Sequence, residues 1–220
     1  MVNNGFIGAE QAAAERRMVL SYSASDTRAG LAALLALDDT LAAILRSTRD
    51  PMVGQLRLTW WHDALSALDT RPAPAEPVLR AIERDVMPKV SGAVLAGMIE
   101  GWVELLDPES LDAERLARFA EGRGGGLFAA VGTVLGANVD DPVGEAGRGW
   151  ALTDLALHVS DPKAAALARS MAAQHLAAAT ARRWSRAGRP LGAMAHLAAM
   201  APDRGAARVG RALWHRLTGR

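Results

Sequence analysis

The stretch of sequence that decides the fold is RAGLAALLALDDTLAAILRSTRDPMVGQLRLTWWHDAL, which runs from Arg28 to Leu65. Its first half is rich in Ala, Leu and Arg, and all three residue types are strong helix formers. Asp50 then precedes Pro51, and this order is typical of a helix cap followed by the proline of a first turn. The stretch therefore predicts two consecutive helices, one over about residues 26–48 and another over residues 51–68.

The whole chain has the same helical character. Half of its 220 residues are apolar and 22% are charged, whereas Phe, Tyr, Ile and Thr are scarce. No stretch alternates between apolar and polar residues in the period-two pattern of a strand. The sequence predicts an all-α single domain over residues 1–220, a bundle of about eight to ten helices. Further helices are expected over about residues 9–21, 77–87, 88–106, 110–135, 142–159 and 162–184, and on either side of Pro202.

Helix ends and one interruption can be read from single residues. Ser25 or Asp26 is expected to cap the helix over residues 26–48. The glycine-rich run GRGGG, from Gly122 to Gly126, interrupts the helix over residues 110–135. This run lacks the Gly-Lys-Ser/Thr ending of a phosphate-binding loop and does not follow a strand. Close approach of two helices, or a kink, is the better account of it.

Charge and composition exclude several classes of function. The 25 basic and 24 acidic residues nearly cancel, so no global charge favours nucleic acid as a partner. Without cysteine, the chain has no disulfide, no cysteine-bound metal and no thiol nucleophile. Its start lacks the pattern of a secretory signal, and apolar runs such as Leu31 to Leu37 are far shorter than the ~20 residues of a transmembrane helix. We expect a cytoplasmic protein with no transmembrane segment.

Two charged residues of the deciding stretch fall on apolar helix faces. At about 100° per residue, Asp38 lies within the apolar stripe of the first helix and Arg57 at the centre of the stripe of the second. A charge removed from water is costly unless it is paired, and the two helices are expected to be antiparallel neighbours. The pattern predicts a buried ion pair between Asp38 and Arg57. The alternative is an internal polar cavity that receives a ligand, with Asp38, Arg57, Gln55 and Trp61 as ligand-binding candidates.

The segment from Tyr22 to Leu65 resembles proteins of the squalene/phytoene synthase family. Members carry an Arg-x-Ala/Gly-Leu-x-Ala-Leu helix and then a Pro-Met/Leu-x-Gly-x-x-Arg-Leu-x-Trp-Trp-x-x-Ala-Leu helix. The run from Phe119 to Gly136 is similar to the family's small-residue helix, and the stretch from Gly149 to Leu152 to the start of its Gly-x-Ala-Leu helix. The residues that match the second pattern are Pro51, Gly54, Arg57, Leu58, Trp60, Trp61, Ala64 and Leu65.

The resemblance implies an all-α fold of the isoprenoid synthase type around a cavity. In active members, two aspartate-rich motifs hold magnesium ions against the diphosphates of two prenyl donors, because hard Mg²⁺ prefers carboxylate oxygens. In this chain Asp38 and Asp39 lie one helical turn before the first motif, and Asp161 lies one residue after the second. The aligned motif positions are occupied by Ala42, Ala43 and Arg46, and by Val159 and Ser160.

The leading interpretation is a squalene/phytoene synthase-like protein with degenerate metal motifs, closer to a divergent branch that includes a respiratory complex I assembly factor. It would hold a prenyl or lipid-like ligand without ionising it, or act on a protein partner in assembly, with no metal or cofactor. One alternative is an active Mg²⁺-dependent prenyl-diphosphate transferase that uses displaced carboxylates. Another is a plain helical interaction module. The displaced carboxylates would be Asp38, Asp39, Asp154 and Asp161.

Smaller polar groupings are interpreted as structural. Asp154 and His158 are spaced i, i+4, with Asp161 on the same side, and a local hydrogen bond on a solvated face is favoured over a metal or acid–base pair. His62 is expected to face solvent. His175 lies among apolar residues and is expected to be a packing residue.

The tryptophans and the C-terminal arginines indicate which parts of the surface could contact a partner or a membrane. Trp60 and Trp61 are expected in the core, the default for large aromatics at helical spacing. Positive charge gathers in the run over residues 181–189 and again near the C-terminus. A solvated face is the simpler interpretation. The alternative is contact with an acidic partner or an anionic membrane surface, with Trp184 and Trp214 at the interface, which would place the protein at the periphery of the inner membrane.

Overall fold

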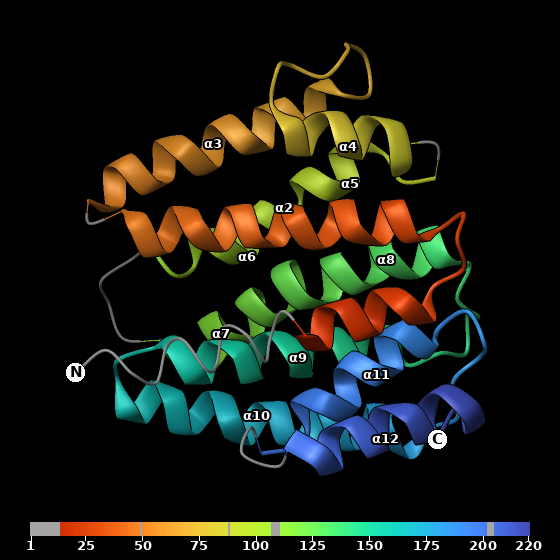
Figure 1. The fold of residues 1–220 in the computed structure, drawn as a ribbon. Coiled ribbons are helices and arrows are strands. Elements are labelled where there is room, and N and C mark those ends of the chain that lie inside the picture. Colours follow the sequence, from red (N-terminus) through yellow and green to blue (C-terminus); the bar gives the residue numbers. More distant parts are fainter. Residues whose placement is uncertain (1–13, 49, 88, 107–110, 202–204) are drawn as a thin grey trace.

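The computed structural model describes residues 14–48, 50–87, 89–106, 111–201 and 205–220, and within them it contains helices and no strand (Figure 1). This confirms the all-α class for the described part of the chain. A helical segment over residues 14–22 comes first. The elements that follow are α2 (Arg28–Ser47), α3 (Pro51–Ala67), α4 (Pro77–Asp85), α5 (Gly92–Ala96), α6 (Met98–Val103), α7 (Ala113–Phe119), the π-helix η1 (Ala120–Gly125), α8 (Gly126–Leu135), α9 (Val143–His158), α10 (Pro162–Ala181), α11 (Arg189–Ala198) and α12 (Gly205–Thr218).

Side-chain caps set the starts of several helices. Asp50 accepts a hydrogen bond from the Met52 amide at the start of α3, and Asp161 caps α10 in the same way. Both caps precede a proline at the first helical position, as the sequence predicts. The expected cap of α2 is wrong: the N-cap is Thr27, and no side chain makes a capping hydrogen bond there.

One predicted helix is divided in two. Residues 89–106 hold α5 and α6 in place of a single helix, because Ser91 caps α5 and Gly97 ends it. Glycine costs about 1 kcal/mol relative to alanine inside a helix, so a junction there is favoured. The helix starts expected at Pro88 and Ser110, and the division expected at Pro202, lie outside the described residues.

The helices are arranged in layers around α2. In Figure 1, α2 crosses the middle of the molecule, with α3 and α4 on one side and α8 on the other. Beyond α8, α9 contacts η1, α10 and α11, and α12 packs on α11. Leucines of α2 and large side chains of α3, α7 and α8 are fully buried where these layers meet; they include Leu31, Leu34, Leu41, Leu58, Phe119 and Phe128. The core therefore runs along both sides of α2.

Helix α3 buries a different face from the one predicted. Gly54, Leu58, Trp61 and Leu65 are buried, so the inward face centres near Leu58. The opposite face exposes an apolar stripe, whose members are Met52, Val53, Leu56 and Trp60. Apolar residues thus lie on two opposite faces of α3, which is why the helical wheel placed the buried face incorrectly and why the expectation of a buried Trp60 is wrong.

Helices α7, η1 and α8 form one continuous rod, so the glycine-rich run does not interrupt the helix as predicted. The run instead adopts a π-helix, Ala120–Gly125, and α-helix resumes directly after it. Two neighbouring helices approach this segment so closely that a side chain would not fit. A Cβ on Gly122 would lie 2.6 Å from the Gly101 amide nitrogen, and one on Gly124 would lie 2.6 Å from the Gly147 carbonyl carbon. The predicted close approach is confirmed on both sides of Arg123.

Candidate functional site

Asp38 is buried in α2, as its place in the apolar stripe predicts, and its partner is Arg123. The side chain of Asp38 is 2% exposed. Arg123 of η1 donates from Nε to Asp38 Oδ1 and from Nη2 to Oδ2, each over 2.9 Å. Two parallel bonds of this kind are the strongest geometry available to a guanidinium and a carboxylate. The buried charge of Asp38 is therefore paired with an arginine that lies 85 residues further along the chain.

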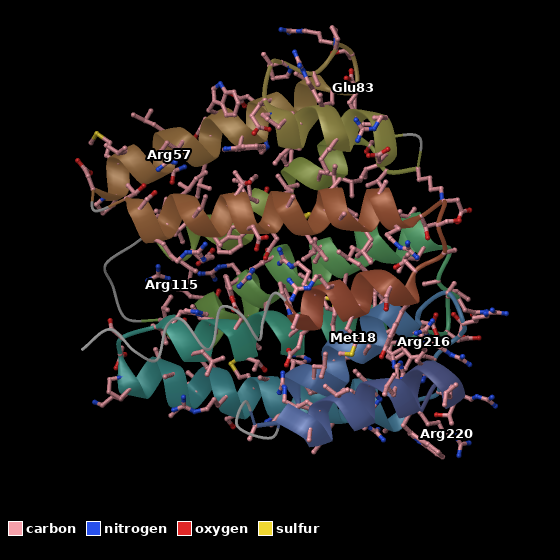
Figure 2. All side chains as sticks on the ribbon, viewed as in Figure 1. Met18, Arg57, Glu83, Arg115, Arg216 and Arg220 are labelled. Carbon is pink, nitrogen blue, oxygen red and sulfur yellow. The ribbon has the colours of Figure 1, made fainter. Side chains whose placement is uncertain are left out.

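The predicted contact between Asp38 and Arg57 is wrong. Arg57, labelled on α3 in Figure 2, is exposed. Its Nη1 donates to Ser47 Oγ and Thr48 Oγ1, each over 3.1 Å. The inward face of α3 centres on Leu58 instead.

Asp154 of α9 is the second carboxylate on Arg123. It accepts a hydrogen bond of 2.6 Å from Arg123 Nη1. Burial opposes ionisation of Asp154, but the charge of Arg123 outweighs it and holds the pKa of that carboxyl below its ordinary value. Burial also opposes the charge of Arg123, and Asp38 and Asp154 overcome this and raise the pKa of the guanidinium. Arg123 and Asp154 are therefore both charged at neutral pH.

Aromatic rings enclose the central guanidinium. The Arg123 Cζ atom lies 4.3 Å from the ring centre of Trp102 in α6 and 4.7 Å from that of Trp150 in α9. Phe119, one turn earlier on the same rod, contributes a third ring at 5.7 Å. Cation–π attraction is strongest where water is excluded. Carboxylates and rings from four helices thus converge on one side chain.

The glycines on either side of Arg123 explain how this convergence is reached. Gly101 of α6 faces Gly122, and Gly147 of α9 faces Gly124, so both helices lie directly against the backbone of η1. This brings Trp102, one residue after Gly101, within reach of the guanidinium. The π-helix adds an extra residue to the turn, which is a known means of re-aiming a side chain.

The other two carboxylates proposed for a displaced metal site lie elsewhere. Asp39 is exposed and forms an ion pair with Arg16 of the segment over residues 14–22. Asp161 caps α10, where its oxygens accept from the amides of Lys163 at 2.9 Å and Ala164 at 3.3 Å. In the described part of the chain, no group of three or more His, Asp or Glu side chains could hold a metal ion. Asp38 and Asp154 alone are brought together, and Arg123 lies between them.

The remaining predicted residues do not join this centre. Gln55 is exposed on α3, and Trp61 is buried on its inner face, with the ring of Trp60 packed edge-on 5.3 Å away. His62 is exposed, as expected, beside Asp63.

Two histidines make local polar contacts. His158 is exposed, and its Nδ1 lies 2.7 Å from the Asp154 carbonyl oxygen, which confirms a local hydrogen bond on that helix. His175 is half-buried, with Nδ1 2.6 Å from Glu145 Oε2. His175 therefore has a polar partner on α9 in addition to its packing contacts.

The C-terminal surface differs from the prediction at one tryptophan. Trp184 is buried, and its Nε1 donates to the Ala179 carbonyl oxygen over 3.2 Å, so it is not an interface residue. Trp214 is exposed on α12 together with Val209, Leu213 and Leu217. None of the described helices combines the length and the apolar character that crossing a membrane requires.

A second titratable cluster lies between α11 and α12. The rings of His196 and His215 contact each other at a tilt of 60°, with centres 4.6 Å apart, and Arg211 donates to His196. Burial, together with the neighbouring His215 and Arg211, lowers the pKa of His196 to about 3. Burial also lowers the pKa of His215 to about 4, and Arg211 contributes. Both imidazoles are neutral in the folded protein at pH 7.

This cluster predicts a loss of stability in mild acid. Unfolded histidines protonate near pH 6.5, so between that pH and about 4 the unfolded chain binds more protons than the folded one. The stability that the neutral side chains of His196 and His215 contribute at pH 7 is therefore lost as the pH falls through this range. We expect the free energy of unfolding, measured with urea, to decrease by about 2 kcal/mol for each of the two histidines from pH 7 to pH 4.5. His215→Leu should reduce this dependence by about half and exposed His62→Leu should not; equal slopes in both variants would contradict the assignment.

Arg123 is the functional candidate that sequence reasoning missed. It stands inside GRGGG, which is predicted to interrupt its helix, so the helical wheel was not applied across that run. The available signal was the spacing of Leu116, Phe119, Ala120 and Leu127, which places Arg123 on one apolar face of a continuous helix. Nothing in the local sequence distinguishes Arg123 from Arg57 as the cation that Asp38 needs.

Comparison of the chain with protein-family models finds no match, and comparisons with curated proteins and with solved structures find none either.

Proposed function

We propose that this chain is a non-catalytic protein of the squalene/phytoene synthase type that works in assembly, through contact with a protein partner. The sequence resemblance of residues 22–65 supports the family. The engagement of Asp38 and Asp154 by Arg123 supports the loss of catalysis. The exposed apolar stripe of α3 supports the protein partner.

The Arg123 contacts are the observation that carries the proposal. A magnesium ion would need the oxygens of Asp38 and Asp154, because these are the two candidate carboxylates that lie close together. Arg123 already neutralises them and cannot give up its proton, since its pKa is raised. Displacing this guanidinium would leave it buried without a partner, which costs several kcal/mol. The centre is therefore suited to hold the helices together rather than to bind a metal–diphosphate complex.

The surface of α3 is suited to a protein partner. Met52, Val53, Leu56 and Trp60 are each between 46% and 72% exposed and form one stripe along the outer side of the helix. Contiguous exposed apolar side chains commonly mark a protein contact. Arg57, beside the stripe, adds a polar edge of the kind found around interfaces.

An apolar cleft favours the second candidate function, the holding of a lipid-like ligand. It has a volume of about 470 Å³ and lies between α9, α10 and α11. Its walls are mainly alanine and leucine side chains, among them Leu157, Leu176 and Leu197. This size lies within the usual range for a small-molecule site.

A turnover assay separates this proposal from the transferase alternative. We expect no release of diphosphate from farnesyl or geranylgeranyl diphosphate in the presence of Mg²⁺, because Arg123 engages both Asp38 and Asp154. Release that requires Mg²⁺ and is abolished by Asp38→Ala, but not by exposed Asp63→Ala, would contradict the proposal. Saturable binding of farnesol without turnover, followed by tryptophan fluorescence, would favour the second candidate.

A retention experiment tests whether the apolar stripe of α3 binds a protein partner. The tagged full chain, incubated with extract of its native host, should retain a partner that Leu56→Glu releases. His62→Glu is the matched control, since it adds the same charge on the polar flank of α3. Equal retention by both variants would show that the apolar stripe is not the contact.

A further inference from the structure

A cleft of about 540 Å³ lies at the end of the bundle where α2 begins. Its walls come from the turn before α2, the end of α8, the loop between α10 and α11, and α12. Three arginines border it: Arg28, Arg186 and Arg216. Figure 2 shows Arg216 at the end of the molecule opposite Arg57, so this cleft is separate from the outer surface of α3.

The positive charges that line the cleft have no carboxylate partner in the described part of the chain. No aspartate or glutamate is among the described residues that line it. In the described ranges, Arg28, Arg186 and Arg216 form no ion pair with a carboxylate. Arg28 is held in place by hydrogen bonds from Nε to the Leu20 carbonyl and from Nη2 to the Ser23 carbonyl, each 3.1 Å. Three cations that converge without an anion of their own form a site for an external one.

Two buried hydroxyl groups in the cleft wall have no partner. Ser23 is 5% exposed, and neither its Oγ nor the Tyr22 Oη makes a hydrogen bond. The other two hydroxyls of the wall are already used, since Ser21 donates to the Met18 carbonyl and Thr27 to the Ala24 carbonyl. A buried hydroxyl without a partner is costly and rare. Ser23 and Tyr22 thus retain donors for a ligand with acceptor oxygens.

We propose that this cleft binds an organic phosphate. A phosphate group offers three or four acceptor oxygens and up to two negative charges, which match several guanidinium donors and two hydroxyl donors. The cleft is larger than an inorganic phosphate needs, and Leu135, Ala24 and Ala187 add an apolar wall for the organic part. The ligand chemistry has two sources, a soluble phosphate ester or the headgroup of a phospholipid. The site is independent of the function proposed above.

The surface of α12 next to the cleft supports the second source, the headgroup of a phospholipid. Leu213 and Leu217, on the same helix as Arg216, are exposed, as is Trp214. A helix that exposes apolar residues beside arginines can lie at a lipid surface, with the phosphate bound by the arginines. A membrane would therefore present the phosphate next to this cleft.

The first arm of the test uses soluble probes and the full chain. Isothermal titration with inorganic phosphate and with sn-glycerol 3-phosphate should show saturable binding, tighter for the ester. Arg216→Gln and Arg186→Gln should each weaken it by about tenfold, the effect of losing one charge-assisted contact of about 1.4 kcal/mol. Arg182→Gln is the matched control: it removes the same charge from an exposed site four residues from Arg186. Equal weakening by Arg182→Gln would overturn the proposal.

The hydroxyl variants separate ligand binding from a structural role. Ser23→Ala and Tyr22→Phe each remove an unpartnered buried group, so the free protein should melt at the same or a higher temperature. Binding of the phosphate ester should nevertheless weaken by about tenfold if the hydroxyls donate to the ligand. Reduced stability with unchanged binding would overturn the assignment.

The second arm distinguishes the two sources. Co-sedimentation is measured with vesicles of phosphatidylcholine alone and of phosphatidylcholine mixed with phosphatidylglycerol. Binding that requires phosphatidylglycerol and is lost in Arg216→Gln and Ser23→Ala, but kept in Arg182→Gln, identifies a headgroup. Binding of the soluble ester without vesicle binding identifies a soluble ligand. Absence of binding to every probe would overturn the proposal.

Discussion

Replacement of Arg123 by methionine is expected to lower the free energy of unfolding by about 3–5 kcal/mol. Methionine fills similar space but leaves Asp38, which is 2% exposed, as a buried charge without a partner, and Asp154 loses its cation as well. The loss of cation–π contact with Trp102 adds to the cost. Urea unfolding at pH 7 measures the change.

Two further variants make this prediction specific to the ion pair. Arg57→Met is the matched control; because Arg57 is exposed and bonds only to hydroxyls, it should cost less than about 1 kcal/mol. The double variant Asp38→Leu/Arg123→Met should recover much of the stability, because replacing a buried pair costs far less than breaking it. Similar losses for Arg57→Met and Arg123→Met would contradict the assigned pairing.

Substitution of Gly124 by alanine is the second large effect, with an expected loss of about 3 kcal/mol. The new Cβ would overlap the Gly147 carbonyl oxygen and lie 2.6 Å from its carbon, so η1 and α9 would have to separate. Their separation would also displace Arg123 from Asp154. Thermal unfolding followed by circular dichroism measures the loss.

The matched control for this variant lies on the same rod. Gly132→Ala places its Cβ 3.5 Å or more from the nearest side chains, so it should be neutral or stabilise the helix by up to about 1 kcal/mol. The test is that Gly124→Ala lowers the stability of the protein whereas Gly132→Ala leaves it unchanged or raises it. Stability unchanged by Gly124→Ala would show that the two helices are free to move apart.

The helical class and several helix starts are local properties, and this is why the sequence alone predicted them. The pairs Asp50–Pro51 and Asp161–Pro162 begin α3 and α10 through contacts within a few residues. The burial of Asp38 was also predictable, because Asp38 lies within an apolar stripe of α2. Helix α3 has apolar residues on two opposite faces, so its sequence does not specify which face is buried.

What the sequence determined by itself is therefore an all-α chain with a buried aspartate that needs a cation. Only the tertiary structure decided that the cation is Arg123 and not Arg57. That choice depends on two glycine contacts, Gly101 with Gly122 and Gly124 with Gly147, which bring helices distant in sequence within touching distance. Helical periodicity describes one helix at a time, whereas the energy that selects the partner of Asp38 comes from packing several helices around one desolvated guanidinium.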